Sequence, residues 1–362
     1  MNFLKTETEG CDGQKRGDLS SGCSQHSSIT YALRDWAEGA LEELGKPVVQ
    51  DLRVGDNMNE HWCFPGLVFL LNETGLIKTE EKANDIGKFI DWYVDHKGPL
   101  SLAGGVEGLG YIKTKYNKVP GDYPDMELIF ASGSLLSGES IRKSTGMSDE
   151  FFEEVYGEVK GREAWSIFPM ILHPKSRGKV RLRDKNPWHW PLFYHDYFQV
   201  EEDAKVMVEG IKAAIRFAET KTFKRVGSKV FKLRIPGCSN HTYGTDSFWR
   251  CAMTYIQFTL HHQSGTCKMG PKSDPTAVVN PQLQVYGIGN LRVGDSSIFP
   301  RLPTAHTYAP TIMIGEKLAD MIKETWGAEL STTTNFYSTE STDQVTESYQ
   351  NNLLNSTSGY GN

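Results

Sequence analysis

Two histidines in the last third of the chain carry side chains that could move a proton. His262 lies in the run His261-His262-Gln-Ser-Gly-Thr-Cys-Lys-Met-Gly, and His306 lies just before a stretch of helical character that begins at Pro310. Imidazole titrates near neutral pH, so either side chain could act as a general base or as a ligand. From these residues alone, a histidine that only makes hydrogen bonds is the commoner case. The positive end of a helix dipole disfavours a protonated imidazole, so we expect His306 to be neutral.

A carboxylate lies between these two histidines in the sequence, at Asp295. Leu291–Val293 is expected to form a short strand that leads into the turn Gly294-Asp295-Ser296. A carboxylate at the carboxyl end of a strand is well placed to accept hydrogen bonds from a ribose or from water. An ordinary Asx-turn explains the same residues equally well.

The elements that must position these residues follow from the spacing of apolar side chains. Apolar residues recur with helical spacing over 31–44, about 80–96, 201–219 and from 310 onward. The pattern favours strands over 47–49, 126–131, 165–172 and 178–183. This mixture predicts α/β plus α+β architecture, with a sheet-based second domain.

Composition and charge restrict the class of protein. The chain has 362 residues, with 39 basic and 45 acidic side chains and a formal net charge of −6. A general nucleic-acid binder needs a surplus of Lys and Arg, so we expect no nucleic-acid partner. The longest apolar run, Phe64–Leu71, is shorter than the roughly 20 residues of a membrane-spanning helix, so we expect no membrane span. The first ten residues are polar and do not resemble a secretory signal peptide.

Six cysteines leave the redox compartment open. No two of them form a Cys-x-x-Cys pair, so we predict no metal site. Cys238 and Cys251 close a loop short enough for a disulfide, although two buried thiols would explain them equally well. Three Asn-x-Thr triplets, at Asn72, Asn240 and Asn355, are candidate N-glycosylation sequons.

Three motifs follow one another in the C-terminal third. The first is His262-x-x-Gly-Thr-Cys-Lys-Met-Gly, the second is Leu291-Arg-Val-Gly-Asp-Ser-Ser-Ile-Phe-Pro, and the third is His306 ahead of Ala-Pro-Thr-Ile-Met-Ile-Gly-Glu-Lys. Their order and spacing resemble the C-terminal signature of the glucose–methanol–choline (GMC) oxidoreductases, which are flavin enzymes that oxidise alcohols. With similar stretches upstream, the resemblance covers about residues 36–327. The most similar branch is that of the FAD- and quinone-dependent glucose dehydrogenases.

The resemblance implies a division of the chain into parts. Segments 36–75 and 255–327 would be the remaining parts of an incomplete, Rossmann-like FAD-binding domain. Residues 76–254 would form a substrate-binding domain of sheet and helices. Residues 1–35 do not resemble the family and are expected to be flexible, and the Ser-, Thr- and Asn-rich residues 328–362 are expected to be a disordered tail.

The resemblance also implies a chemistry. His262 would be the general base that takes the hydroxyl proton of a sugar or other alcohol, while hydride passes to N5 of FAD. His306 would bind the substrate oxygen. FAD contacts would come from Gly294, Asp295, Thr307 and Tyr308. A quinone or oxygen would accept the electrons, and an extracellular location would fit the branch.

One family motif is missing from the printed sequence. The family's FAD pyrophosphate lies on a Gly-x-Gly-x-x-Gly turn, and no glycine pair in this chain has the required third glycine. The chain therefore has the residues of the chemistry without this cofactor motif. The alternative hypothesis is a truncated, catalytically silent fragment that acts only as a binding module.

Overall fold

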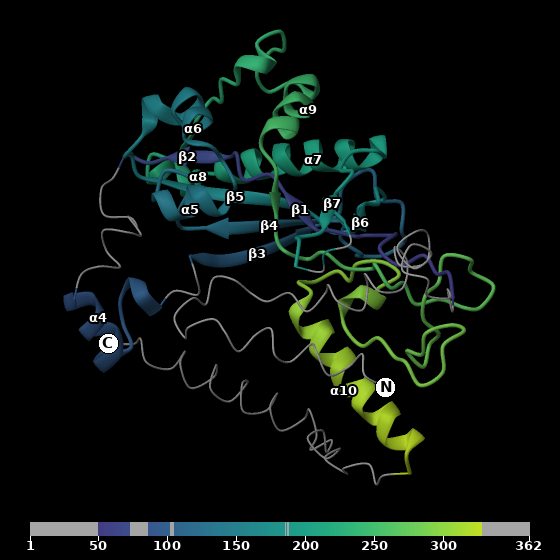
Figure 1. Ribbon diagram of the computed structural model, residues 1–362. Coiled ribbons are helices and arrows are strands. Elements are labelled where there is room, and N and C mark those ends of the chain that lie inside the picture. The colour runs from purple at the N-terminus through teal and green to yellow at the C-terminus, as the bar shows by residue number, and fades with distance from the viewer. Residues whose placement is uncertain (1–49, 73–85, 102–104, 185, 187, 328–362) are drawn as a thin grey trace. The chain divides into compact units, whose positions relative to one another are not determined.

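The computed structural model describes residues 50–72, 86–101, 105–184, 186 and 188–327 (Figure 1). The helix predicted over 31–44, the strand predicted over 47–49 and the predicted tail lie outside these residues. The chain divides into two compact units after Ile314, which lies within helix α10 (Tyr308–Thr325). All site residues discussed below belong to the first unit.

The first unit is built on one antiparallel sheet. Its described strands follow the order β3-β4-β5-β1-β9, and β2 pairs with both β5 and β8. The bounds of these strands are β1 Trp62–Cys63, β2 Val68–Leu70, β3 Val106–Ile112, β4 Met126–Ala131, β5 Ala164–Ile171, β8 Lys229–Val230 and β9 Phe258–Thr259. A separate hairpin pairs β6 (Lys179–Arg181) with β7 (Leu192–Tyr194). The ladders between the described strands are antiparallel, as expected for the sheet of an α+β domain.

The predicted central strands are confirmed. β4 has the bounds predicted for it, β5 begins one residue early, and β6 lies within the predicted 178–183. β4 and β5 are mostly buried, which explains their near-continuous apolar sequences. The strand predicted at Leu291–Val293 is wrong, because Arg292 makes only an isolated bridge with Gln284.

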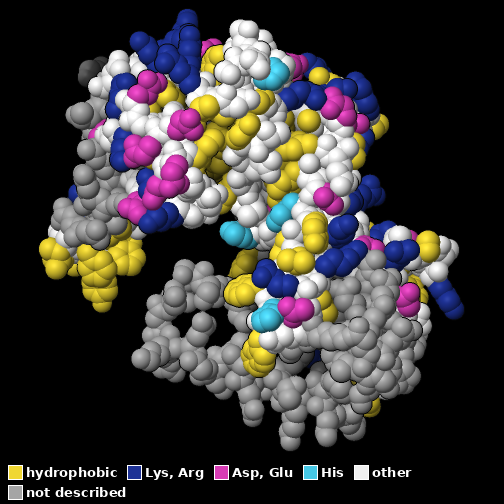
Figure 2. Space-filling view, turned by 45° about the horizontal axis from the view of Figure 1, so that its top comes forward, with side chains coloured by type: hydrophobic (Ala, Val, Ile, Leu, Met, Phe, Trp, Pro, Cys, Tyr) yellow, Lys and Arg dark blue, Asp and Glu magenta, His cyan; other side chains and the backbone are white. Residues whose placement is uncertain are grey.

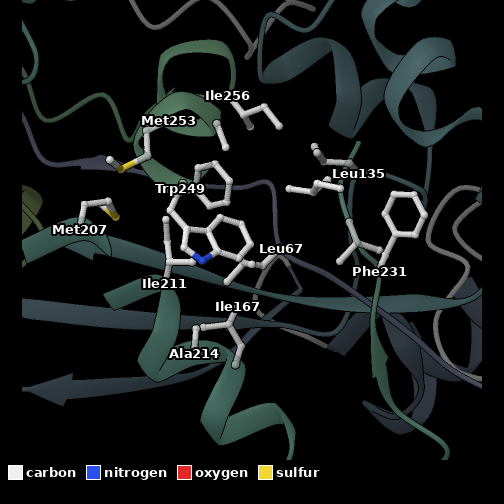
Figure 3. Close-up of a cluster of buried hydrophobic side chains, with 14 of the residues drawn as sticks. Leu67, Leu135, Ile167, Met207, Ile211, Ala214, Phe231, Trp249, Met253 and Ile256 are labelled. Carbon is white, nitrogen blue, oxygen red and sulfur yellow. The ribbon is translucent and has the colours of Figure 1, made fainter. Parts of the chain in front are cut away.

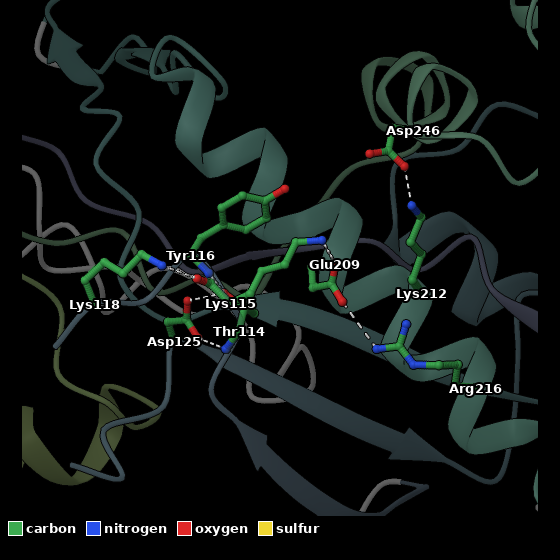
Figure 4. Close-up of polar contacts among 9 residues, drawn as sticks. All are labelled: Thr114, Lys115, Tyr116, Lys118, Asp125, Glu209, Lys212, Arg216 and Asp246. Atoms are coloured by element: carbon green, nitrogen blue, oxygen red, sulfur yellow. Dashed lines mark hydrogen bonds and ion pairs between the residues drawn. The ribbon is translucent and has the colours of Figure 1, made fainter. Parts of the chain in front are cut away.

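The described α-helices are α4 Ile86–Asp95, α5 Glu139–Ser144, α6 Asp149–Tyr156, α7 Glu201–Ala218, α8 Lys221–Arg225, α9 Asp246–Tyr255 and α10. α7 confirms the predicted helix, and α10 begins two residues before Pro310. α7 runs along one face of the sheet and packs against β4 and β5 (Figure 1). Its outer surface carries ion pairs, including Glu209 between Lys115 and Arg216 (Figure 4).

The main core lies between α7, α9 and the sheet. Trp249 of α9 is 1% exposed and lies among Leu67, Ile167, Ile211 and Met253 (Figure 3). Burying a tryptophan side chain removes a large apolar area from water. The packing of α9 on the sheet therefore depends strongly on Trp249.

The surface is mixed in charge. Basic and acidic side chains are interspersed on the face that Figure 2 shows.

Helix α4, which lies within the predicted 80–96, exposes Phe89, Ile90 and Tyr93 among its apolar residues. Within the described ranges, no helix combines the length and the apolar character needed to cross a bilayer.

Cys238 and Cys251 form a disulfide. The bond joins the short 3₁₀ helix Pro236–Cys238 to α9, and so ties the loop ahead of α9 to the core. Cys63 and Cys267 are buried free thiols. Of the two arrangements left open by the sequence, the structure has the paired one for Cys238 and Cys251.

Removing the Cys238–Cys251 disulfide should lower the free energy of unfolding by about 3 kcal/mol, because a loop of this length gains that much entropy in the unfolded chain. Urea unfolding of a Cys238→Ala/Cys251→Ala variant measures the loss. Reduction of the unmodified protein with dithiothreitol should give a similar loss. Equal unfolding midpoints with and without reductant would contradict the prediction.

Candidate active site

His262 lies at the centre of a buried cluster of imidazoles. Its Nδ1 is 3.0 Å from Nδ1 of His61, and Nε2 of His61 is 3.0 Å from the carbonyl oxygen of Leu172. The rings of His262 and His306 meet edge to face with 4.9 Å between their centroids. Three segments far apart in the sequence thus bring His61, His262 and His306 together, and the two histidines singled out from the sequence are neighbours.

Burial keeps His262 neutral. Desolvation, followed by the charges of His306 and His261, lowers the pKa of His262 to about 4. Desolvation and the neighbouring His262 lower the pKa of His61 to about 3. At neutral pH both imidazoles are therefore uncharged, and His262 has the protonation state that a general base requires.

His306 is different, because its pKa is raised, whereas the helix dipole considered in the sequence analysis would lower it. Its Nε2 lies 3.2 Å from Oε1 of Glu127, and this hydrogen bond raises the pKa of His306. A carboxylate in direct contact outweighs the partial charge of a helix end. The Glu127 side chain is fully buried in β4. The sequence offered one signal that was missed, an acidic residue within the apolar strand Met126–Ala131.

Replacing Glu127 with Gln should lower the pKa of His306, because the amide keeps the shape of the side chain and removes the negative charge. The ¹H NMR titration of the His306 ring measures the change. Glu107→Gln, which removes an exposed carboxylate from β3, is the matched control and should leave the titration unchanged. An unaltered His306 pKa in the Glu127 variant would show that another group sets it.

Glu60 supports the loop that carries His262. Its Oε1 accepts a hydrogen bond of 3.0 Å from the backbone N–H of His262, and its Oε2 accepts one of 2.8 Å from the Thr259 hydroxyl. Burial raises the pKa of Glu60 to about 8, against the lowering effect of these hydrogen bonds. Glu60 thus holds the segment that runs from Thr259 to His262.

When the pH is raised from 6.5 to 8, the melting temperature of a Glu60→Gln variant should fall less than that of the unmodified protein. The folded-state pKa of Glu60 lies above its ordinary 4.5, so the folded protein holds a proton that the unfolded chain releases. Its contribution is full below pH 4.5 and disappears as the pH rises to about 8. The lowered pKa values of His61 and His262 act in the opposite direction, and mainly below their ordinary 6.5. Melting temperatures at pH 6.5 and 8 test this, and parallel curves for both proteins would contradict it.

The four residues predicted to contact FAD lie on two short segments. Asp295 caps the 3₁₀ helix Ser296–Ile298, and its Oδ1 accepts a 2.7 Å hydrogen bond from the Ser297 N–H. The ordinary turn left open by the sequence is thus present, and Oδ1 is committed to it. Gly294 precedes this cap and is half-buried. Thr307 is buried just before α10, and Tyr308 is exposed in its first turn.

Three buried side-chain oxygens close in sequence to site residues have no hydrogen-bond partner within the described ranges. The side-chain oxygens of Asn59 (Oδ1), Ser264 and Ser297 are buried and have no hydrogen-bond partner among the described residues. Each lies two residues from a site residue, namely His61, His262 and Asp295. Buried polar groups are nearly always paired in folded proteins, so these oxygens are available to a polar ligand such as FAD.

Comparison with known proteins gives a family match over part of the chain. The family model for GMC oxidoreductases matches residues 174–315, which include both His262 and His306. This part of the chain is therefore a C-terminal domain of the GMC oxidoreductase family, and the predicted resemblance is confirmed.

Individual relatives cover more of the chain. It is 36% identical to "Glucose dehydrogenase [FAD, quinone]" of Drosophila melanogaster over 241 residues, which are 67% of this chain and 37% of the relative. It is 32% identical to "Ecdysone oxidase" of Bombyx mori over 290 residues, 78% of this chain and 40% of the relative. A formate oxidase structure from Aspergillus oryzae has the same fold, with a TM-score of 0.61 at 21% identity over 78% of this chain and 49% of that one. The chain thus spans half or less of each relative's length.

Proposed function

We propose that the protein is a FAD-dependent oxidoreductase that acts on the CH–OH group of a sugar or another alcohol. The observation that carries the proposal is the contact between a neutral, buried His262 and a His306 that is paired with a carboxylate. One imidazole can accept a proton while the other donates to the same oxygen. The glucose dehydrogenase and ecdysone oxidase relatives support an alcohol as substrate.

His262 and His306 have different roles in the proposed oxidation of the alcohol. When bound, FAD would supply the acceptor for hydride from the alcohol carbon. His262 takes the hydroxyl proton, because an alkoxide is a much better hydride donor than an alcohol. His306, with one N–H directed to Glu127, has its other nitrogen available for the substrate oxygen. Its raised pKa favours a cation, which stabilises negative charge developing on that oxygen.

The visible absorbance spectrum of the purified chain, with and without added FAD, tests the proposal. We expect oxidised-flavin bands that stay with the protein through gel filtration and are bleached anaerobically by a sugar or alcohol. Reoxidation by a quinone or by oxygen then distinguishes the two classes of electron acceptor. A folded chain that retains no flavin would overturn the proposal for this chain. It would favour the silent binding module that the missing glycine motif suggests.

A further inference from the structure

We propose that His61 is a positioning residue that holds His262 in the imidazole tautomer whose Nε2 can accept a proton. The inference rests on the role proposed above for His262. It follows from two hydrogen bonds of His61, one of which ends at a carbonyl oxygen that can only accept. The carbonyl of Leu172, His61 and His262 form a chain of contacts in which each nitrogen has a defined part.

The chain begins at a group that can only accept. The carbonyl oxygen of Leu172 lies 3.0 Å from Nε2 of His61, so this nitrogen must carry a hydrogen. A neutral imidazole has one N–H, so Nδ1 of His61 is an acceptor. That atom lies 3.0 Å from Nδ1 of His262, which must therefore be the donor. The hydrogen of neutral His262 is then on Nδ1, and Nε2 keeps its lone pair.

His61 must be neutral to accept this hydrogen bond, and its surroundings keep it neutral. The side chain is fully buried. The charged groups that act on it are His262, His173 and His306, and each would repel a second positive charge. A protonated His61 would lose its solvation by water and gain no compensating anion, which explains the low pKa of His61 given above. A doubly protonated His61, which would reverse the tautomer of His262, is excluded at neutral pH.

The arrangement also holds after proton transfer. The Nε2–H bond of His262 forms as the alcohol O–H bond breaks, and the O–H electron pair stays on the alkoxide oxygen. His262 is then an imidazolium that still donates its Nδ1–H to His61, so no second proton has to move. Without this acceptor, the Nε2–H tautomer, which neutral histidine favours in water, would place a hydrogen where the alcohol proton must go.

Two substitutions separate the hydrogen bonds from the bulk of the side chain. In His61→Gln, the amide can donate to the Leu172 carbonyl and accept from His262, as the imidazole does. His61→Leu can do neither. With FAD bound, we expect the leucine variant to lower kcat for flavin reduction about 10- to 100-fold, as is typical for loss of a residue that orients a functional histidine. We expect little change in KM, and glutamine should restore most of the rate.

A direct readout is the tautomer itself. Two-bond ¹H–¹⁵N correlation spectra of the histidine-labelled protein distinguish Nδ1–H from Nε2–H, and His262→Gln identifies the signals of His262. We expect Nδ1–H in the unmodified protein and in His61→Gln, and a larger share of Nε2–H in His61→Leu. An Nε2–H tautomer of His262 in the unmodified protein would overturn the inference, even if His61→Leu does not fold. If His262 has the expected Nδ1–H tautomer but the protein does not oxidise alcohols, that result would count against the proposed function alone.

A different observation assigns a modification site. The structure assigns Asn240 of the Asn240-His-Thr sequon as an N-glycan acceptor. Asn240, His241 and Thr242 are all exposed, in the loop between the 3₁₀ helix Pro236–Cys238 and α9. The disulfide that closes this loop forms and persists in oxidising compartments, which are also where N-glycans are added. The sequon, its exposure and the neighbouring disulfide thus all support N-glycosylation of this loop.

The modification needs a lipid-pyrophosphate-linked oligosaccharide as donor. The Asn240 Nδ2 bonds to the anomeric carbon as that carbon's bond to the phosphate oxygen breaks. The lipid pyrophosphate leaves with the bonding electrons, and the amide loses one proton. The exposed amide leaves room for such a bulky addition without disturbing the core.

Expression of the full chain behind a secretory leader in insect cells tests the assignment. We expect a glycosidase-sensitive mass on the Asn240 peptide, found by mass spectrometry, that is lost in Asn240→Gln and in Thr242→Ala but kept in Thr242→Ser. The threonine variants retain the asparagine, so they report on the sequon rather than on the fold. A secreted protein with an unmodified Asn240 peptide would refute the assignment.

Discussion

A His262→Ala variant should reduce its bound flavin with an alcohol about 10²- to 10⁴-fold more slowly than the unmodified protein, the usual contribution of a general base. The neutral imidazole would be gone, and the other nearby ring, His306, is held by Glu127 with a raised pKa. The alcohol would then have to lose its proton to water. Anaerobic stopped-flow reduction of the flavin measures the rate directly.

The pH dependence adds a second expectation for the same variant. The rate of the unmodified protein should fall as the pH drops toward about 4, where His262 becomes protonated. That acid limb should be absent without the imidazole. His189→Ala, which removes an exposed imidazole from the loop between β6 and β7, is the control and should leave the rate unchanged. A His262 variant that keeps the full rate would refute the assignment of the base.

The largest effect on stability is expected at Trp249. Trp249→Ala should lower the free energy of unfolding by about 3–5 kcal/mol, because it removes a large buried ring and leaves a cavity between α7, α9 and the sheet. Urea unfolding followed by circular dichroism measures the loss.

Trp188→Ala is the matched control for this substitution, since it deletes the same side chain where it is 78% exposed. The control should change stability by less than about 0.5 kcal/mol. Similar losses in the two variants would mean that the contribution of Trp249 does not come from its burial.

The sequence predicted the elements better than it predicted their electrostatics. Patterns of apolar residues are local, and they were sufficient for α7, β4 and β5. The motif around His262 was also sufficient to single out that residue. The pKa of His306 was not predictable in the same way, because it depends on Glu127, which lies 179 positions away in the chain. A helix dipole can be read from nearby residues, but a carboxylate brought in by the fold cannot.

The role of His61 illustrates the same limit. The three motifs that singled out His262 and His306 do not include His61. Its hydrogen-bond partners, His262 and the Leu172 carbonyl, lie 201 and 111 positions away in the sequence. The strand predicted at Leu291–Val293 also depends on distant packing. The segment bonds to residues 283–285 through one bridge and two backbone hydrogen bonds, and this pairing is too short to form a ladder.

The pairing of β1 with β9 has a consequence for folding. Trp62 pairs with Thr259, and Cys63 with Phe258, so this edge of the sheet cannot form until nearly 200 residues between the two strands have been synthesised. Closing so long a loop is entropically unfavourable before the intervening strands are in place. The contact between His61 and His262 depends on the same closure. On the ribosome, the cluster of His61, His262 and His306 should therefore be among the last parts of the first unit to form.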